Sequence, residues 1–151
     1  MNWDQYFLKL ISIIKKKSKD PHTNFGAVIV GPDHEIRSTG FNSPPRGVND
    51  NITRRKYRPE KYLWMVHAES NAIFNAARVG IPCKGCTIYI NGLPCTECAK
   101  AIIQAGIIEV KYNKKEWKKF LEGKDITTGW LSVLDRSLLM LNEAGVEINA
   151  I

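Results

Sequence analysis

Helical and strand-like hydrophobic patterns follow one another in the first part of the chain. Apolar side chains recur at close to helical spacing over residues 3–17, and the lysines that end this stretch suit the C-terminus of a helix. Residues 25–30 are apolar and β-branched, and a Gly-Pro-Asp turn separates them from a second strand-like stretch at 35–41. The pattern predicts one helix followed by an antiparallel hairpin.

Helix and strand signals alternate in the second part of the chain. Good helix formers fill residues 67–78 and stop before a glycine and a proline, and a further helix over 95–106 ends in a glycine. Short apolar stretches at 87–90 and 107–112 flank that second helix. This order predicts that the two strands pair in parallel through a right-handed crossover.

The remaining segments carry weaker signals. Residues 42–59 hold prolines, asparagines and arginines without a sustained period, which predicts a long loop of the kind that is often functional. Residues 111–124 are rich in lysine and fit a solvated amphipathic turn or helix anchored by its few apolar residues. A last helix is predicted over 130–141 and an edge strand over 146–148.

Length and composition place the chain among ordinary globular proteins. The 151 residues fit a single domain spanning 1–151, and the 44% hydrophobic content excludes disorder of the whole chain. No apolar run approaches the roughly 20 residues that span a bilayer, and the N-terminus lacks the pattern of a signal peptide. We therefore expect a cytoplasmic protein that does not bind membranes.

The chain has a formal net charge of +7. A positive balance of this size favours a phosphorylated substrate, a nucleic acid or an acidic partner, without choosing among them.

All four cysteines lie in one short stretch between Cys83 and Cys98. Such clustering is a poor framework for disulfides that stabilise a whole domain, and in a reducing compartment it indicates metal binding first. One interpretation joins both Cys-x-x-Cys pairs into a closed four-thiolate zinc site of purely structural role. The two pairs are closer together than that kind of site usually has them, and we expect Cys83 and Cys86 to be a loop thiol and a small buried residue.

A second interpretation uses a histidine that lies outside the cysteine stretch. His67 and Cys95 each begin a predicted helix, and Cys98 follows one turn later. One imidazole and two thiolates supply three ligands of tetrahedral zinc and leave the fourth position for water, which is typical of a catalytic site. The positive ends of the two helices would also favour the thiolates.

Glu69 follows His67 by two positions, too close on a regular helix to reach the same ion easily. We expect its carboxylate to act on the water instead. It can take a proton from water, pass it to a ring nitrogen of the substrate, and later protonate a departing amine. Hydrolytic deamination uses all these parts. A noncatalytic zinc scaffold is the alternative that leaves Glu69 without a purpose.

His-x-Glu followed by Pro-Cys-x-x-Cys is the signature of zinc nucleobase deaminases. The resemblance extends along nearly the whole chain, in SKDPHTNFGAVIVGPDHEIRSTGFNSPPRG, HAESNAIFNAAR, KGCTIYI, PCTECAKAIIQAGI and LNEAGVEI. In order and spacing these stretches resemble the deoxycytidylate deaminases. The resemblance implies an α/β, cytidine-deaminase-like, three-layer fold in which helices flank a central mixed β-sheet. It also implies deamination of dCMP to dUMP, one catalytic Zn²⁺ per chain, and a homo-oligomer, often a hexamer.

The same resemblance assigns roles to individual residues. It makes His67, Cys95 and Cys98 the zinc ligands and Glu69 the proton shuttle. Its substrate-binding residues are Asn42 for the sugar, with Asn24 and the backbone at Ala68 as weaker candidates.

Regulation by nucleotides is a further implication of the resemblance. Arg78 lies where the family has an arginine implicated in nucleotide response. Phe41 and Ser43 replace a tyrosine and a glycine in a stretch associated with dCTP activation and dTTP inhibition, and a triphosphate effector would bring Mg²⁺.

The phosphate partners are left open by the sequence. Guanidinium groups suit phosphate oxygens, so the loop arginines are candidates. They are Arg46, Arg54, Arg55 and Arg58.

A nucleic-acid editing enzyme similar to the tRNA adenosine deaminases is the other alternative. The net positive charge would then mark a binding surface. The basic residues are dispersed among acidic ones, and the long loop at 42–59 resembles the mononucleotide family more closely. We therefore expect a small nucleotide substrate and no nucleic-acid partner.

Overall fold

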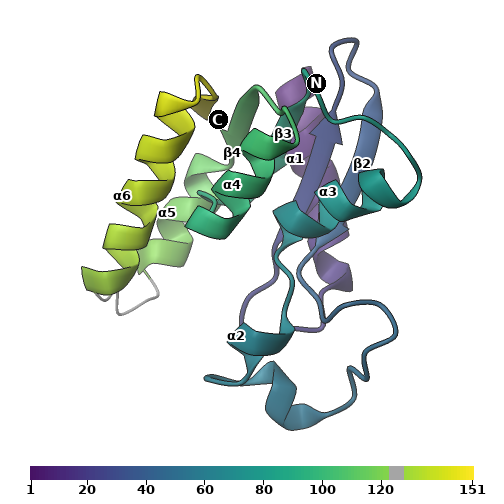
Figure 1. Cartoon of the computed structure of the whole chain (residues 1–151), viewed down its shortest axis with the longest axis vertical. Coiled ribbons are helices and arrows are strands. Elements are labelled where there is room, and N and C mark those ends of the chain that lie inside the picture. Colours follow the sequence, from purple (N-terminus) through teal and green to yellow (C-terminus); the bar gives the residue numbers. More distant parts are fainter. Residues whose placement is uncertain (123–127) are drawn as a thin grey trace.

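The computed structural model describes residues 1–122 and 128–151. Within these ranges the strands form one mixed sheet in the order β2-β1-β3-β4-β5, with helices on both faces (Figure 1). β1 pairs antiparallel with both β2 and β3, whereas β3, β4 and β5 are mutually parallel. The strands are β1 Gly26–Val30, β2 Ile36–Phe41, β3 Thr87–Ile90, β4 Glu109–Tyr112 and β5 Glu147–Ala150.

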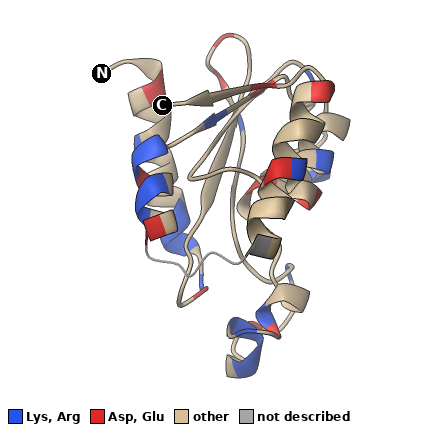
Figure 2. Cartoon of the chain, turned by 90° about the vertical axis from the view of Figure 1, so that its left-hand side faces the viewer, with Lys and Arg blue, Asp and Glu red and all other residues tan. Residues whose placement is uncertain are grey.

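The helices form two layers, with the sheet between them in the view of Figure 2. α1 packs against β1 and β3, while α3 packs against β2 and β1, and α4 packs against α6. The helices are α1 Trp3–Ile14, α2 Lys61–Trp64, α3 Ala68–Arg78, α4 Thr96–Gln104, α5 Lys114–Glu122 and α6 Thr128–Glu143, with short 3-10 turns η1 Lys15–Lys17 and η2 Thr53–Lys56. In the described ranges, none of these helices is both long and apolar enough to cross a bilayer.

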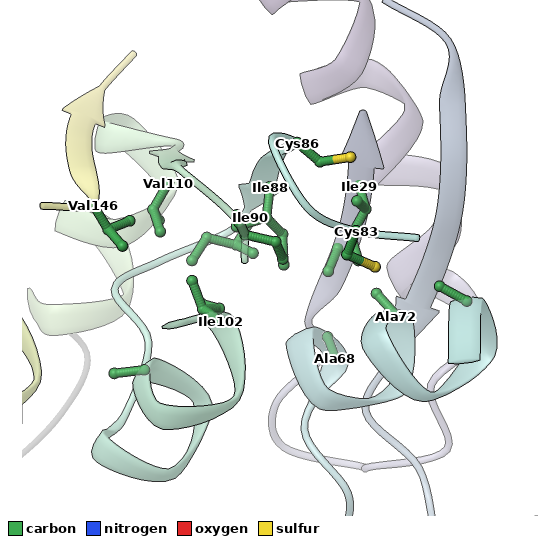
Figure 3. Packing of buried hydrophobic residues seen from close by; sticks show 14 of the residues in the cluster. Ile29, Ala68, Ala72, Cys83, Cys86, Ile88, Ile90, Ile102, Val110 and Val146 are labelled. Carbon is green, nitrogen blue, oxygen red and sulfur yellow. The ribbon is translucent and has the colours of Figure 1, made fainter. Parts of the chain in front are cut away.

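The alternation of side chains along β1 explains the two layers. All five residues of β1 are buried, because both of its faces are covered. Val28 and Val30 pack with Phe7 and Ile11 of α1 on one face. Ala27 and Ile29 face the larger cluster on the other side, which Figure 3 shows with Ala68, Ala72 and Ile102 from α3 and α4. The central strands therefore hold α3 and α4 against one side of the sheet.

Close contact fixes α3 on β2. A Cβ built on Gly40 would lie 2.3 Å from the Ala68 carbonyl oxygen and 2.4 Å from the Ala72 nitrogen, so only glycine fits there. The Ser38 hydroxyl donates a buried 2.7 Å hydrogen bond to the Ala72 carbonyl. The Asn75 side-chain amide donates another to the carbonyl of Thr39 at 2.7 Å. The start of α3 is thereby held at a defined distance from the sheet.

The predicted architecture is confirmed, with small shifts at the ends of elements. The hairpin, the parallel pairing of β3 with β4 and the β5 edge strand are all present. The first helix is α-helical only to Ile14 and continues as η1. The lysine-rich segment contains α5, and positions 123 and 124 of the predicted helix lie outside the described residues.

The predicted loop at 42–59 carries the short helix η2 and leads into α2. This segment extends beyond one end of the sheet (Figure 1), and the positions of its Lys and Arg residues are coloured blue in Figure 2.

Candidate functional site

Two helix N-termini meet on the face of the sheet that α3 and α4 cover. His67 is the N-cap residue of α3, and Cys95 is the N-cap residue of α4, with Cys98 in the first turn. The His67 Nδ1 atom lies 3.4 Å from Cys95 Sγ and 3.5 Å from Cys98 Sγ. Their potential ligand atoms all lie within 4.8 Å of one another. The fold therefore brings together the three residues that the sequence predicts as metal ligands.

These separations match what a tetrahedral zinc ion requires. With Zn–N near 2.0–2.1 Å and Zn–S near 2.3 Å, a nitrogen and a sulfur ligand stand about 3.6 Å apart. Two thiolates and an imidazole are also a donor set that zinc prefers over magnesium or calcium. Cys98 is buried, Cys95 is half-buried and His67 is exposed, so the centre is open on one side. The residues fit a zinc site that is accessible to a small molecule.

The three side chains strongly affect one another's protonation. The pKa of Cys95 is lowered to about 4, chiefly by a hydrogen bond from the Cys98 thiol and further by His67. The pKa of His67 is raised to about 9, chiefly by its hydrogen bond to Cys95. The pKa of Cys98 is raised, because its proton is shared with Cys95 and its sulfur is buried. A divalent cation bound by the three side chains would displace the protons of His67 and Cys98.

Glu69 lies beside this cluster without joining it. In the described residues the metal-ligating group comprises the histidine and the two cysteines only. The Glu69 side chain lines the same cavity as His67 and Cys95 and is only 9% exposed. Burial raises the pKa of its carboxyl above the usual range. Such a carboxyl is suited to hold and return a proton.

Cys83 and Cys86 do not take part in this centre. Both are buried in the main hydrophobic cluster, as Figure 3 shows, and neither belongs to the metal-ligating group of the described residues. The pKa of each thiol is raised by burial. The structure therefore does not assemble the four-thiolate alternative.

A cavity of about 400 Å³ opens over the metal cluster and Glu69. Its polar part contains Asn42 and the cationic side chains of Arg58 and Lys61. Its other wall is apolar and largely aromatic, with the side chains coming from five separate parts of the chain. These residues are Phe25, Met65, Leu93, Trp117, Phe120, Trp130 and Leu134. The volume suits a small organic molecule that combines a flat apolar part with an anionic one.

The predicted substrate residues have different positions relative to the cavity. Asn42 lines it and is buried, and its side-chain amide donates to the Thr23 carbonyl and accepts from the Phe25 N–H. Ala68 is buried at the first position of α3. Asn24 is exposed and donates to the Asp20 carbonyl instead of lining the cavity.

The predicted effector residues lie outside the cavity lining. Phe41 and Ser43 are joined to α3 through Asn71, whose side-chain amide donates to the Phe41 carbonyl and the Ser43 hydroxyl. Arg78 is exposed at the last position of α3. Arg46 is exposed too and donates to the side chain of Asn75 at 2.6 Å. Of the four loop arginines, Arg58 is the one that lines the cavity.

Sequence reasoning missed several residues of the site. Ser70 places its hydroxyl 3.6 Å from Cys98 Sγ, and its position directly after Glu69 was the available signal. Lys61 and Asp20 form a salt bridge of 2.9 Å in the cavity wall, with only 7% and 4% of their side chains exposed. Burial alone would raise the pKa of Asp20, but hydrogen bonds from Lys61 and from the backbone of His22 and Thr23 hold it below its usual value. No local pattern pairs these two distant residues.

Comparison with known proteins gives a consistent picture. A family model for the cytidine and deoxycytidylate deaminase zinc-binding region matches residues 1–114. The human deoxycytidylate deaminase is 39% identical over 115 residues, which cover 73% of this chain and 64% of the human protein. An uncharacterized deaminase from Aliivibrio fischeri is 38% identical over 146 residues, covering 97% of this chain and 91% of that one. The chain thus spans less than two thirds of the human relative's length.

Solved structures show the same fold. The apo dCMP deaminase of cyanophage S-TIM5 superposes with a TM-score of 0.70 at 24% identity, covering 98% of this chain and 96% of that one. The same enzyme in complex with dCMP and dUMP gives a TM-score of 0.73 at 21% identity, with 97% and 95% coverage. The predicted cytidine-deaminase-like fold is therefore confirmed.

Proposed function

The chain belongs to the family of zinc-binding cytidine and deoxycytidylate deaminases, and we propose that it hydrolyses the exocyclic amine of dCMP to give dUMP and ammonia. The observation that carries this proposal is the placement of buried Glu69 beside the His67, Cys95 and Cys98 cluster at the floor of one cavity. Relatives named deoxycytidylate deaminases in human and mouse support dCMP as the substrate.

The proposed chemistry divides between the metal and Glu69. A zinc ion held by the histidine and the two cysteines would acidify a water molecule and stabilise negative charge on its oxygen. The Glu69 carboxylate takes one proton from that water and passes it to the ring nitrogen next to the amino-bearing carbon. It then conveys the second proton to the amino group, which departs as ammonia while the carbon gains a carbonyl oxygen. The raised pKa of Glu69 suits a group that must hold each proton between these transfers.

The polar part of the cavity suits a sugar phosphate. Asn42 has one donor and one acceptor site engaged with Thr23 and Phe25, which fixes its amide and leaves a second site of each kind for a sugar hydroxyl. The guanidinium of Arg58 lies 5.6 Å from the centre of the Tyr62 ring and presents a planar donor fork suited to phosphate oxygens. The backbone N–H of Ala68 is a further proposed contact for the base. Arg58 replaces Arg46 as our candidate for the phosphate.

Nucleotide regulation and assembly remain predictions. Phe41 ends β2, Ser43 lies in the loop after it, and Arg78 ends α3, all outside the cavity lining. Any response to dCTP or dTTP, with Mg²⁺, would therefore act on the site through the α3–β2 contact. A homohexamer and a cytoplasmic location are proposed from the family resemblance.

A substrate panel tests the proposal. Zinc-loaded protein is assayed for ammonia release from dCMP, deoxycytidine, CMP, dCTP and a tRNA anticodon stem, with and without dCTP or dTTP as effectors. We expect the highest kcat/KM for dCMP, and a kcat lower by about 10²–10⁴ in the matched Glu69→Gln protein. A preference for deoxycytidine or for the anticodon stem would overturn dCMP as the substrate. Complete inactivity of the zinc-loaded protein toward the whole panel would overturn deamination itself.

A further inference from the structure

The C-terminal helices contribute to the cavity although they lie outside the residues matched by the family model. The match ends at residue 114, yet Trp117, Phe120, Trp130 and Leu134 all line the cavity. On α6 the spacing of Trp130, Leu134 and Leu141 places all three on one face of the helix. Leu141 is fully buried in the main core and Leu134 is 6% exposed. This face therefore runs from the core of the protein into the cavity.

A buried hydrogen bond sets the position of α6 relative to the metal cluster. The hydroxyl of Ser137, which shares the inward face, donates a 2.6 Å bond to the Pro94 carbonyl, directly before Cys95. Leu134 stands about one turn before Ser137, and Trp130 about 6 Å farther along the axis. Leu134 and Trp130 thus lie one after the other along the cavity wall, with Leu134 nearer to Cys95.

The aromatic rings at this wall pack against one another. Trp117 and Phe120 are stacked with centroids 5.3 Å apart, and Trp117 and Trp130 are tilted at 5.6 Å. Trp117 is itself pressed against Gly92, where a Cβ would meet its ring at 2.1 Å. Because both rings pack against the largely buried Trp117, Phe120 and Trp130 are held in place before any ligand binds.

We propose that Trp130 and Leu134 of α6 bind the apolar face of the substrate's pyrimidine and its deoxyribose. This inference rests on the proposed function. A pyrimidine that points its amino-bearing edge at Glu69 must lay its flat faces against the side walls, and the α6 wall is rigid and apolar. The phosphate, at the other end of the nucleotide, then reaches the polar part around Arg58. The two parts of the cavity recognise different parts of one molecule.

Alanine substitutions on the two faces of α6 test this assignment. Trp130→Ala and Leu134→Ala remove side chains of the cavity wall. Leu131→Ala and Leu139→Ala are matched controls, since these residues are 45% and 57% exposed and lie outside the cavity. Each protein is assayed with dCMP and with deoxycytidine, after zinc content and thermal unfolding have been measured.

The expected pattern separates ring recognition from phosphate recognition. Trp130→Ala should lower kcat/KM for dCMP and for deoxycytidine by the same factor of about ten, chiefly through KM. Arg58→Ala should lower kcat/KM for dCMP alone. The two control variants should keep wild-type kinetics. Trp130→Phe, which keeps an aromatic face, should restore most of the loss and answers the case in which the alanine variant folds poorly.

Two results would overturn the inference. One is a folded, zinc-loaded Trp130→Ala protein with unchanged kcat/KM for both substrates. The other is a loss confined to dCMP, which would place the phosphate and not the ring at this wall. Failure of the proposed function looks different, since the wild-type protein itself would then prefer another substrate of the panel or release no ammonia at all.

Discussion

Replacing Gly40 by alanine should disturb the metal cluster without touching any of its ligands. Gly40 lies in β2 directly under the first turn of α3, and the atoms nearest to an added Cβ all belong to the backbone of Ala68 and Ala72. Backbone atoms cannot swing aside as the end of a side chain does. Ala68 lies between His67 and Glu69, so a displacement of its carbonyl is carried to both residues.

The size of the disturbance follows from the contact distances. Ordinary contacts of a Cβ begin near 3.4 Å, and the Ala68 oxygen would stand at 2.3 Å, so α3 must retreat by about 1.1 Å. Zinc sites tolerate ligand distances within about 0.2 Å. Overpacking of this kind costs about 1–3 kcal/mol, and the loss of the buried Ser38 bond to α3 adds about 1 kcal/mol. We expect a free energy of unfolding lower by about 2–4 kcal/mol, weaker zinc retention and a roughly hundredfold lower kcat.

Denaturant unfolding, zinc retention against a chelator and ammonia release from dCMP measure these three effects. Gly129→Ala is the matched control, because no atom of the described residues lies within 4 Å of its added Cβ and the residue is part of α6. This control should keep full activity, with stability unchanged or raised by up to about 1 kcal/mol. A Gly40→Ala protein that keeps its zinc and wild-type kcat would show that the α3–β2 distance does not set the geometry of the site.

Three further predictions concern single side chains. Glu69→Gln should retain zinc and bind dCMP while kcat falls by about 10²–10⁴, measured by metal analysis, calorimetry and ammonia release; undiminished turnover would refute the proton shuttle. Cys98→Ser should lose zinc as well as rate, because a hydroxyl is a poorer ligand than a thiolate, and full zinc stoichiometry would indicate other ligands. Lys61→Met should lower the free energy of unfolding by about 3–5 kcal/mol at pH 7, since it leaves the buried Asp20 carboxylate unpaired. The pKa of Asp20 is lowered in the folded protein, so its ion pair stabilises the fold above about pH 4 and is lost as pH falls through that lowered pKa. In urea titrations the difference between Lys61→Met and wild type should therefore shrink in acid, and a pH-independent difference would contradict this reading.

The elements of the fold were predictable where the pattern is local. The apolar run of β1, the helix formers of α3 and the glycine that ends α4 each carry their signal within a few residues. Boundaries shifted by two or three residues, as at Ile14, because the last turn of a helix depends on what packs against it. The cluster of the three candidate metal ligands was predictable for the same reason, since their spacing places them at helix starts.

The walls of the cavity could not be predicted from the sequence, because they are formed by contacts between residues that are far apart in the chain. Trp130 and Leu134 read as the apolar face of an ordinary helix, and nothing near them in the chain indicates that the Ser137 bond to Pro94 holds this face beside Cys95. Lys61 and Asp20 are likewise separated by the whole hairpin. A charged residue in a polar loop predicts exposure, whereas these two side chains are among the most buried polar groups of the described chain.

The two asparagines show why a residue type at an expected position does not settle its role. Asn42 and Asn24 were both expected at the substrate, and both side chains bind the backbone of the segment before β1. Asn42 does so from within the cavity wall, where its amide joins Thr23 and Phe25 and keeps an open site toward the ligand. Asn24 does so from the exposed side, where its amide braces the turn that holds Asp20 against Lys61. The same hydrogen-bonding capacity is therefore available at the cavity in the case of Asn42 and supports a turn outside it in the case of Asn24. The position of the side chain relative to the cavity, which the residue type does not fix, separates the two.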